Sequence, residues 1–368
     1  MADPNPHEFI ATVAAVLVAI ALFLIFDTAL ARLDSQETKS HAASEYTAGE
    51  RLVGEGKVPE AIEHLRTAST LDRSNSAYAI ALAAAILENG RPGDAEDLLQ
   101  PVLERGATNG AANLIMARIL VKEGRTEEAK SYYHRAIYGL WTQDAPHNRS
   151  AARFELIDLL ARTGARQELL SELLPIQDDS SVGEPGRRRL GHLLLAAGAP
   201  GRAAAIFHEL LQRHPRDADA YTGLGESALA LGNFQTARAD FAAAERLSPT
   251  ARAIEARIDV ADSAIAIDPT QRGLRISEEL RRSRNLVRIT IASIRACLGA
   301  TPPQLAAIAL DSAERFMATK PRAGELNDAT EEDLALAQEL WKLRPPKCIA
   351  RPASYDEALA LIQVRLAQ

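Results

Sequence analysis

Cysteine and aromatic residues are scarce in this sequence of 368 residues. Phe, Trp and Tyr make up 5% of the chain, and there are two cysteines, Cys297 and Cys348. Two cysteines so far apart exclude a zinc site and a CxxC redox motif. They could pair in an oxidising compartment or remain free thiols in the cytosol, and the sequence leaves both open. Few aromatics together with abundant alanine fit helices that pack closely through small side chains.

Motifs of catalysis and cofactor binding are also missing. The sequence contains no GxxxxGKS/T phosphate loop, HExxH, CxxCH or GxSxG. Its eight histidines are scattered, whereas a metal site needs several convergent ligands. We therefore expect a protein that is not an enzyme, and we assign no catalytic residue, metal ligand, cofactor or small-molecule substrate.

The chain has no excess of positive charge. Charged residues make up 25% and the net charge is −7, so nothing global indicates nucleic-acid binding. One local exception is a basic stretch that could contact an anionic surface. Charge runs on helices are usually solvated, so we expect a solvated face balanced by nearby glutamates. The stretch comprises Arg272, Arg275, Arg281, Arg282, Arg284 and Arg288.

One uncharged run occupies residues 9–26, FIATVAAVLVAIALFLIF. As a helix it would span roughly 27 Å, about the thickness of a hydrocarbon core. We interpret residues 1–33 as an N-terminal tail followed by a single transmembrane helix. A cleaved signal peptide is the alternative, because residues 29–31 have the A-x-A form. However, no Lys or Arg precedes the run, and it is longer than an ordinary signal sequence.

The residues that flank this run bear on its orientation. No Lys or Arg precedes it, whereas Arg32 and Lys39 follow it. The positive-inside rule then favours a single-pass protein whose large domain faces the cytoplasm, with the periplasm left open. Residues 34–41 are polar and are predicted to form a linker or a helical stalk.

A pattern with a period of 34 residues begins at about Ala42. Leu224-Gly225, Gly232, Ala237, Phe241 and Pro249 repeat Leu190-Gly191, Gly198, Ala203, Phe207 and Pro215. One glycine recurs in steps of 34, 34, 40, 34 and 34 residues, at Gly56, Gly90, Gly124, Gly164, Gly198 and Gly232. Such a period is typical of a helix-turn-helix unit that buries its apolar face against its neighbours.

These residues resemble the tetratricopeptide repeat (TPR), which places Leu-Gly, Ala, an aromatic residue, Ala and Pro at these offsets. The resemblance implies six TPR-like repeats over residues 42–251. Gly225 and Ala237 would lie where two helices cross, and Phe241 would fill the space between units. Gly232 would end a first helix at positive φ. The expected fold is all-α: a right-handed TPR helical-hairpin solenoid, preceded by one transmembrane helix and followed by a C-terminal helical module.

The fourth repeat departs from the pattern in two ways. Leu169 occupies the position that alanine holds in the other units, which predicts a wider helix crossing. The 40-residue step indicates an insertion near residues 137–149, and insertions in solenoids often lie on the binding face. Trp141 in this insertion is a candidate contact for a partner. We favour the alternative that Tyr138 and Trp141 cover the seam between repeats three and four.

Residues 252–368 are predicted to form the C-terminal helical capping module. Residues 250–267 read as a helix that caps the array, and residues 273–298 follow as one or two helices with regular apolar spacing. Pro302 and Pro303 precede a further helix that ends at about Ala318. Thr330, with Asp333 three residues later, is expected to start the next helix after a polar loop. Ser354 and Glu357 form a capping-box pattern for a last helix.

The TPR resemblance also implies a concave groove lined by the first helix of each unit, where peptides or partner helices bind. We expect an acidic partner segment at its middle, which is basic with apolar interruptions. The carboxylate-clamp set of chaperone-binding TPR domains is missing. The candidate groove residues are Tyr46, Glu50, Ile80, Ala84, Leu114, Arg118, Lys122, Phe154, Asp158, Arg162, Arg188, His192, Thr222 and Glu226.

The chain thus resembles bacterial TPR proteins with an N-terminal anchor. That resemblance implies a membrane-anchored scaffold that recruits a partner protein to the membrane in envelope assembly, secretion support or protein maturation. Two other interpretations stay open: a permanent structural subunit of a membrane complex, and a regulatory partner of a separate enzyme.

Overall fold

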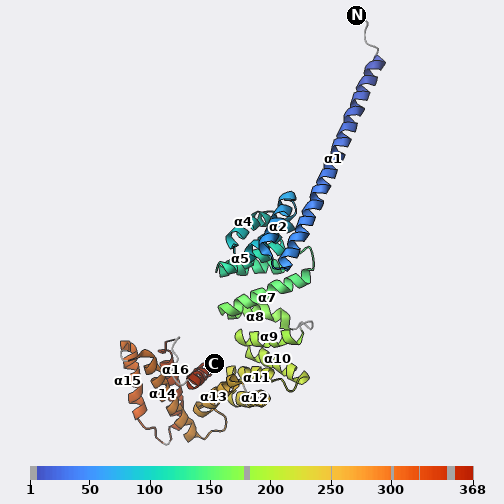
Figure 1. The fold of residues 1–368 in the computed structure, drawn as a ribbon. Helices are drawn as coiled ribbons and strands as arrows, with labels where there is room; N and C mark the ends of the chain where they lie inside the picture. Colours follow the sequence, from blue (N-terminus) through green and yellow to red (C-terminus); the bar gives the residue numbers. More distant parts are fainter. Residues whose placement is uncertain are drawn as a thin grey trace. The chain divides into compact units, whose positions relative to one another are not determined.

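The computed structural model describes residues 6–177, 183–249, 251–299, 302–322, 324–345 and 353–367. Within these ranges every regular element is a helix, apart from one isolated bridge between Asn109 and Leu140. The chain divides into two compact units, Met1–Leu159 and Leu160–Gln368. Figure 1 shows the helices in chain order.

The first unit contains three repeats, and the first of them begins with the C-terminal part of one long helix. Its helices are α1 (Pro6–Gly54), α2 (Val58–Leu71), α3 (Ser76–Glu88), α4 (Pro92–Arg105), α5 (Gly110–Lys122), α6 (Thr126–Tyr138) and most of α7 (Ala145–Thr163). Figure 1 shows α1 as one long helix whose C-terminal part packs beside α2. Residues 34–41 belong to this helix, so the stalk interpretation of that segment is correct.

The second unit continues the repeats and ends in the C-terminal module. Its repeat helices are α8 (Arg166–Gln177), α9 (Glu184–Ala196), α10 (Pro200–Arg213), α11 (Ala218–Ala230) and α12 (Phe234–Leu247). The module follows with α13 (Arg252–Ile267), α14 (Ile276–Leu298), α15 (Gln304–Ala318), α16 (Leu326–Trp341) and α17 (Ala353–Leu366).

The ends of the repeat helices follow from local chemistry. All six glycines of the 34-residue pattern have φ between 70° and 78°, a conformation that costs a residue without Cβ little. Their predicted role is therefore confirmed. Several first helices start on a side-chain cap, since Asn75, Asn109 and Asp217 accept hydrogen bonds from backbone N–H groups at 3.0–3.1 Å. Second helices α2, α4 and α10 begin with proline in the first turn, as expected.

Two buried positions recur in each second helix of the repeats. The small position is at most 1% exposed in every unit: Ala61, Ala95, Ala129, Leu169, Ala203 and Ala237. The large position four residues later is at most 4% exposed: Leu65, Leu99, Tyr133, Leu173, Phe207 and Phe241. Positions four apart lie on one helix face, so each second helix presents the same pair of residues to the core.

Glycines of the first helices make room for these large side chains. A Cβ at Gly225 would lie 2.5 Å from the ring of Phe241, whose atoms are its nearest neighbours. The close approach expected at Gly225 is thus made to Phe241. Phe207 lies against both Gly191 of its own unit and Gly223 of the next. An aromatic side chain therefore fills the joint between two units, as predicted.

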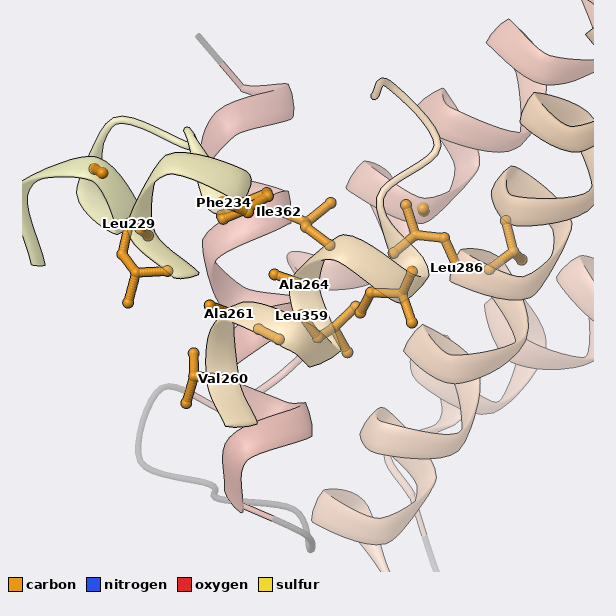
Figure 2. Close-up of a cluster of buried hydrophobic side chains, with 14 of the residues drawn as sticks. Leu229, Phe234, Val260, Ala261, Ala264, Leu286, Leu359 and Ile362 are labelled. Carbon is orange, nitrogen blue, oxygen red and sulfur yellow. The ribbon is translucent and has the colours of Figure 1, made fainter. Parts of the chain in front are cut away.

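The C-terminal module shares a hydrophobic core with the last repeat, which supports its capping role. Figure 2 shows side chains from α11, α12, α13, α14 and α17 in one cluster, among them Leu229, Phe234, Val260, Ala261, Ala264, Leu286, Leu359 and Ile362. Arg365 of α17 ties the module to the repeats: Nη1 donates to the Gly232 carbonyl at 3.0 Å and to Asp268 Oδ2 at 2.9 Å.

One helix start in the module was predicted wrongly. α16 begins at Leu326, four residues before Thr330. The Thr330 hydroxyl donates to the Leu326 carbonyl inside the helix. Asp333 is fully buried and accepts a hydrogen bond from Ser283, so its role is in the core and not at a helix start.

The chain has two cysteines, Cys297 and Cys348. Cys297, in the last turn of α14, is disulfide-bonded. Cys348 lies outside the described residues.

In the part of the chain that the structure describes, no helix has the length and apolarity needed to cross a membrane. Most side chains of residues 9–26, on which the anchor prediction rests, lie outside the described residues.

Candidate protein-binding groove

A hollow of about 500 Å³ lies on first helices of the first unit. Helices α3 and α5 supply most of its lining at the three- and four-residue spacing that gathers side chains on one helix face. The lining consists of Ala84, Leu87, Glu88, Ile115, Arg118, Val121, Lys122, Tyr133 and Glu155. Three of these residues, Ala84, Arg118 and Lys122, were groove candidates from the sequence.

The hollow has an apolar floor and a charged rim. Leu87 and Val121 are partly buried and Ile115 is 7% exposed, whereas Glu88 and Lys122 are exposed. An apolar pocket with a few polar groups at its edge is the usual composition of a binding site. The floor can accept an aliphatic side chain, and the rim can pair with charges that flank it.

An ion pair at one side of the hollow fixes its electrostatics. Arg118 Nε donates to Glu155 Oε2 at 2.9 Å and Arg118 Nη2 donates to Oε1 at 2.6 Å. The Tyr133 hydroxyl donates to Glu155 Oε2 at 3.1 Å. The hydrogen bonds to Glu155 raise the pKa of Arg118. Because carboxylate and guanidinium carry opposite charges, the positive field expected from Arg118 is largely cancelled.

The first repeat places its predicted residues in a separate aromatic cluster. The rings of Tyr46 and Tyr78 are 5.0 Å apart between centroids. Burial and a hydrogen bond with Glu50 raise the pKa of Tyr46 to about 12. Ile80 is partly buried on the neighbouring helix and does not line the hollow.

Leu114 and Trp141 lie outside the lining of the hollow. Leu114 is 7% exposed and packs in the core of the first unit. The Trp141 indole lies where a side chain on Gly110 would be, and its Nε1 donates to the Ala136 carbonyl at 2.9 Å. It closes the third repeat, in keeping with the packing interpretation that we favoured. Tyr138, expected beside it in the seam, is 72% exposed.

Helix α7 carries three further candidates. Phe154 and Asp158 are partly buried, and Arg162 is exposed. Glu155 on the same helix was missed, although it completes the hollow. The sequence signal for Glu155 was its position next to Phe154, on the first helix of the repeat that follows the one containing Arg118.

In the second unit, Arg188, His192 and Glu226 each lie close to a side chain that can carry the opposite charge. Arg188 Nη1 lies 2.6 Å from Asp217 Oδ2, and His192 Nε2 lies 3.1 Å from Asp219 Oδ2. Glu226 pairs with Arg257 at 2.6 Å. The Thr222 hydroxyl donates to the Ala218 carbonyl of its own helix. The charge of Arg188 is therefore compensated, as that of Arg118 is.

Three of the six arginines of the basic stretch near α14 also have partners within the chain. Arg281 and Arg282 both bond to Glu278, and Arg284 donates to the carbonyls of Met317 and Thr319. These contacts favour the expected balanced face over an anion-binding surface.

Family models of the tetratricopeptide repeat match residues 52–119, 87–138 and 188–252. The chain therefore contains TPR repeats, and the expected all-α solenoid of TPR hairpins is confirmed at that level.

Several solved structures are similar at low identity. The TPR2AB domain–pHSP90 complex of yeast Sti1 is 19% identical over 83% of this chain and 98% of that chain, with a TM-score of 0.29. PilW, a type IV pilus biogenesis factor, is 17% identical over 58% of this chain and 96% of that chain, with a TM-score of 0.42. A TPR protein from Parabacteroides merdae is 16% identical over 81% and 99%, with a TM-score of 0.40. At these scores the likenesses carry no argument about what this chain binds.

Proposed function

We propose that this chain is a TPR scaffold that holds a segment of a partner protein in the hollow over α3 and α5. The observation that carries the proposal is the combination of an apolar floor with exposed charges at its rim. Helical grooves of this kind bind extended or helical segments through a few anchor side chains. The lining contains no Ser, Thr, Cys or His, and the described residues hold no group of metal ligands, so we favour binding as the use of the hollow.

The rim defines which segment fits best. With Arg118 held by Glu155, Lys122 is the exposed cation of the lining and Glu88 is the exposed carboxylate. We therefore narrow the expected acidic segment to one that has an aliphatic anchor and a single nearby carboxylate. A strongly acidic segment would be repelled by Glu88.

A photo-crosslinking residue tests this site. Benzoylphenylalanine in place of Leu87 should form a covalent adduct with one partner in cells, because Leu87 lines the hollow. The same residue in place of Glu104, which is exposed on α4 outside the lining, is the matched control. Mass spectrometry of the adduct would name the partner. Equal adducts from both positions, or adducts from position 104 alone, would place the partner elsewhere.

The charge requirement is a second prediction. Lys122→Glu should lower the yield of the Leu87-position adduct by about threefold, because one exposed ion pair is replaced by a repulsion. Arg105→Glu makes the same charge change at an exposed site of α4 and should leave the yield unchanged. An effect of equal size from both variants would mean that only net charge matters.

The crosslinking experiment also distinguishes recruitment from the two other interpretations, a permanent structural subunit and a regulatory partner of an enzyme. A recruited partner should leave the chain in mild detergent unless crosslinked, whereas a permanent structural subunit should remain bound without crosslinking. A regulatory role predicts that adding the purified chain changes the activity of the partner.

We also propose that residues 9–26 anchor the scaffold in a membrane. The uncharged sequence of this run supports the proposal, as do Phe23 and Phe26, which are 70% and 63% exposed at its end. The apolar surface of such residues is stabilised by lipid. Full-length protein should sediment with membranes and resist carbonate extraction. A chain that starts at Asp34 keeps the buried Ala42 and should be soluble. Complete release of the full-length chain by carbonate would contradict the anchor, and a mature N-terminus at Arg32 would indicate a signal peptide.

The disulfide at Cys297 bears on orientation. Disulfides persist in oxidising compartments and are rare in the cytosol. This favours a location outside the cytoplasm for the second unit, against the lean of the two flanking charges Arg32 and Lys39. In intact cells, a membrane-impermeant thiol reagent should label Cys297 only after treatment with a reductant that does not cross the membrane. Labelling without reductant, or only after lysis, would favour the cytoplasm.

A further inference from the structure

A second hollow, of about 620 Å³, lies between α15 and α16 in the C-terminal module. It is separate from the proposed groove of the first unit and is lined by different residues. The lining consists of Ala309, Ser312, Ala313, Phe316, Glu332, Ala335, Leu336, Glu339, Leu340 and Leu343. None of these positions belongs to the TPR pattern of the sequence.

Helix α15 presents an apolar stripe beside this hollow. Leu305 is 81% exposed and Ile308 is 55% exposed. They precede Ser312 and Phe316 at the three- and four-residue spacing of one helix face. The stripe from Leu305 to Phe316 covers twelve residues. Its ends are roughly 16 Å apart along the helix, which is about three turns. Two exposed apolar side chains on one helix face, followed by the polar Ser312 and the partly exposed Phe316, indicate an interaction site.

Helix α16 supplies the opposite wall and its charge. The charged residues in the lining are Glu332 and Glu339, both exposed. The helix carries five acidic residues, Asp328, Glu331, Glu332, Asp333 and Glu339, and no Lys or Arg. Lys342 pairs with Glu339 at 2.6 Å, but both side chains are more than 60% exposed, so this pair exchanges readily for another cation.

We propose that this hollow, the α15–α16 groove, binds an amphipathic helix of a partner protein whose apolar stripe is flanked by Lys or Arg. Two helices that present parallel stripes form a groove in which a third helix buries residues at i, i+3 or i+4, and i+7. The carboxylates of Glu332 and Glu339 at the rim complement basic flanks on that helix.

The charge of the groove argues against the other occupants. An anionic lipid surface would be repelled by the acidic residues of α16. A second copy of the chain related by a twofold axis would bring the same face, with its carboxylates, against itself. A basic partner helix meets neither obstacle, and it gains from the net charge of −7 of the whole chain.

A designed peptide provides the probe for this groove. A fluorescein-labelled 18-residue helix with leucines at i, i+3, i+4 and i+7 and lysines at the flanks should bind the full-length chain at low salt. Two matched peptides have the same leucines with glutamate flanks, or the same composition with the leucines scrambled. In fluorescence anisotropy each should bind about tenfold more weakly than the first, a factor well within the reach of a few apolar contacts or charges. Equal binding by the scrambled peptide would overturn the proposal.

Variants of α16 test where the peptide binds. Glu332→Lys should weaken binding of the lysine-flanked peptide about fivefold, because a rim attraction becomes a repulsion. Glu331→Lys makes the same change on the adjacent residue, which is outside the lining, and should have less than half that effect. Ala335→Arg, at an exposed position of the lining, should block the groove and abolish binding without lowering the thermal midpoint.

Two outcomes would contradict the proposed use of the α15–α16 groove. An effect of Glu331→Lys as large as that of Glu332→Lys would show attraction to the net charge alone and overturn a built groove. A dimer in light scattering that Ala335→Arg converts to monomer would assign the face to a second copy of the chain. Because the peptide is read directly, none of these results depends on the function proposed for the first unit.

Discussion

Phe207→Ala should lower the free energy of unfolding by about 3–5 kcal/mol, the usual cost of truncating a buried phenylalanine. Phe207 is fully buried in α10. Its ring lies 2.7 Å and 2.3 Å from the positions that a Cβ would take on Gly191 and Gly223. Neither glycine has a side chain that could fill the space, so the cavity would persist. Urea denaturation measures the loss, and Tyr138→Ala, at 72% exposure, should change the midpoint little.

A glycine of the neighbouring repeat makes the test specific. Gly223→Ala in the unchanged chain should destabilise by about 1–3 kcal/mol, because its methyl group would overlap the Phe207 ring. In the Phe207→Ala background the same substitution should stabilise, since the methyl then fills the cavity and alanine favours the helix by roughly 1 kcal/mol. A change of sign between the two backgrounds is the expected result. The same sign in both would mean that Phe207 does not form the joint between repeats.

Predicting the repeats from sequence worked because their determinants are local and periodic. Gly232 and Ala237 have a fixed spacing within one hairpin, so a 34-residue period reveals the equivalent residues in the units that keep the pattern. Positive φ at the glycines and burial of the small positions followed from that spacing alone. The period does not show which side chain approaches each glycine. The sequence analysis therefore placed Gly225 at the crossing with Ala237, whereas the nearest side-chain atoms belong to the Phe241 ring.

The groove was predicted only in part, for a related reason. Spacing identifies which residues lie on the first helices, and two of these, Arg118 and Lys122, line the hollow. Electrostatics depends on which opposite charge lies within hydrogen-bond distance on another helix. Glu155 reaches Arg118 across 37 residues of sequence, and Asp217 reaches Arg188 across 29. The positive field inferred from counting basic residues ignored these partners.

Asp333→Ala should be about as costly as the loss of Phe207, roughly 3–5 kcal/mol, because it removes the acceptor of the Ser283 hydroxyl and the partner of the largely buried Arg284 at the same time. Asp333 is fully buried between α14 and α16. Its Oδ2 accepts a hydrogen bond from the Ser283 hydroxyl at 2.8 Å and lies 3.2 Å from Arg284 Nε. The Arg284 side chain is 12% exposed. Chemical denaturation of the full-length chain measures the effect.

The matched variant Asp333→Asn separates charge from shape. It keeps an oxygen that can accept from Ser283 and removes the ionisable group, so its cost should be well below that of alanine. Burial raises the pKa of Asp333 above 3.8, and Ser283 and Arg284 oppose this only in part. The unfolded chain therefore loses its proton at lower pH than the native chain does. As pH rises from below 3.8 through the raised native pKa, the unfolding free energy of the unchanged chain should fall relative to that of Asp333→Asn. A difference that stays constant over this window, or that grows in the opposite direction, would show that Arg284 dominates and that the carboxylate is stabilised in its ionised form.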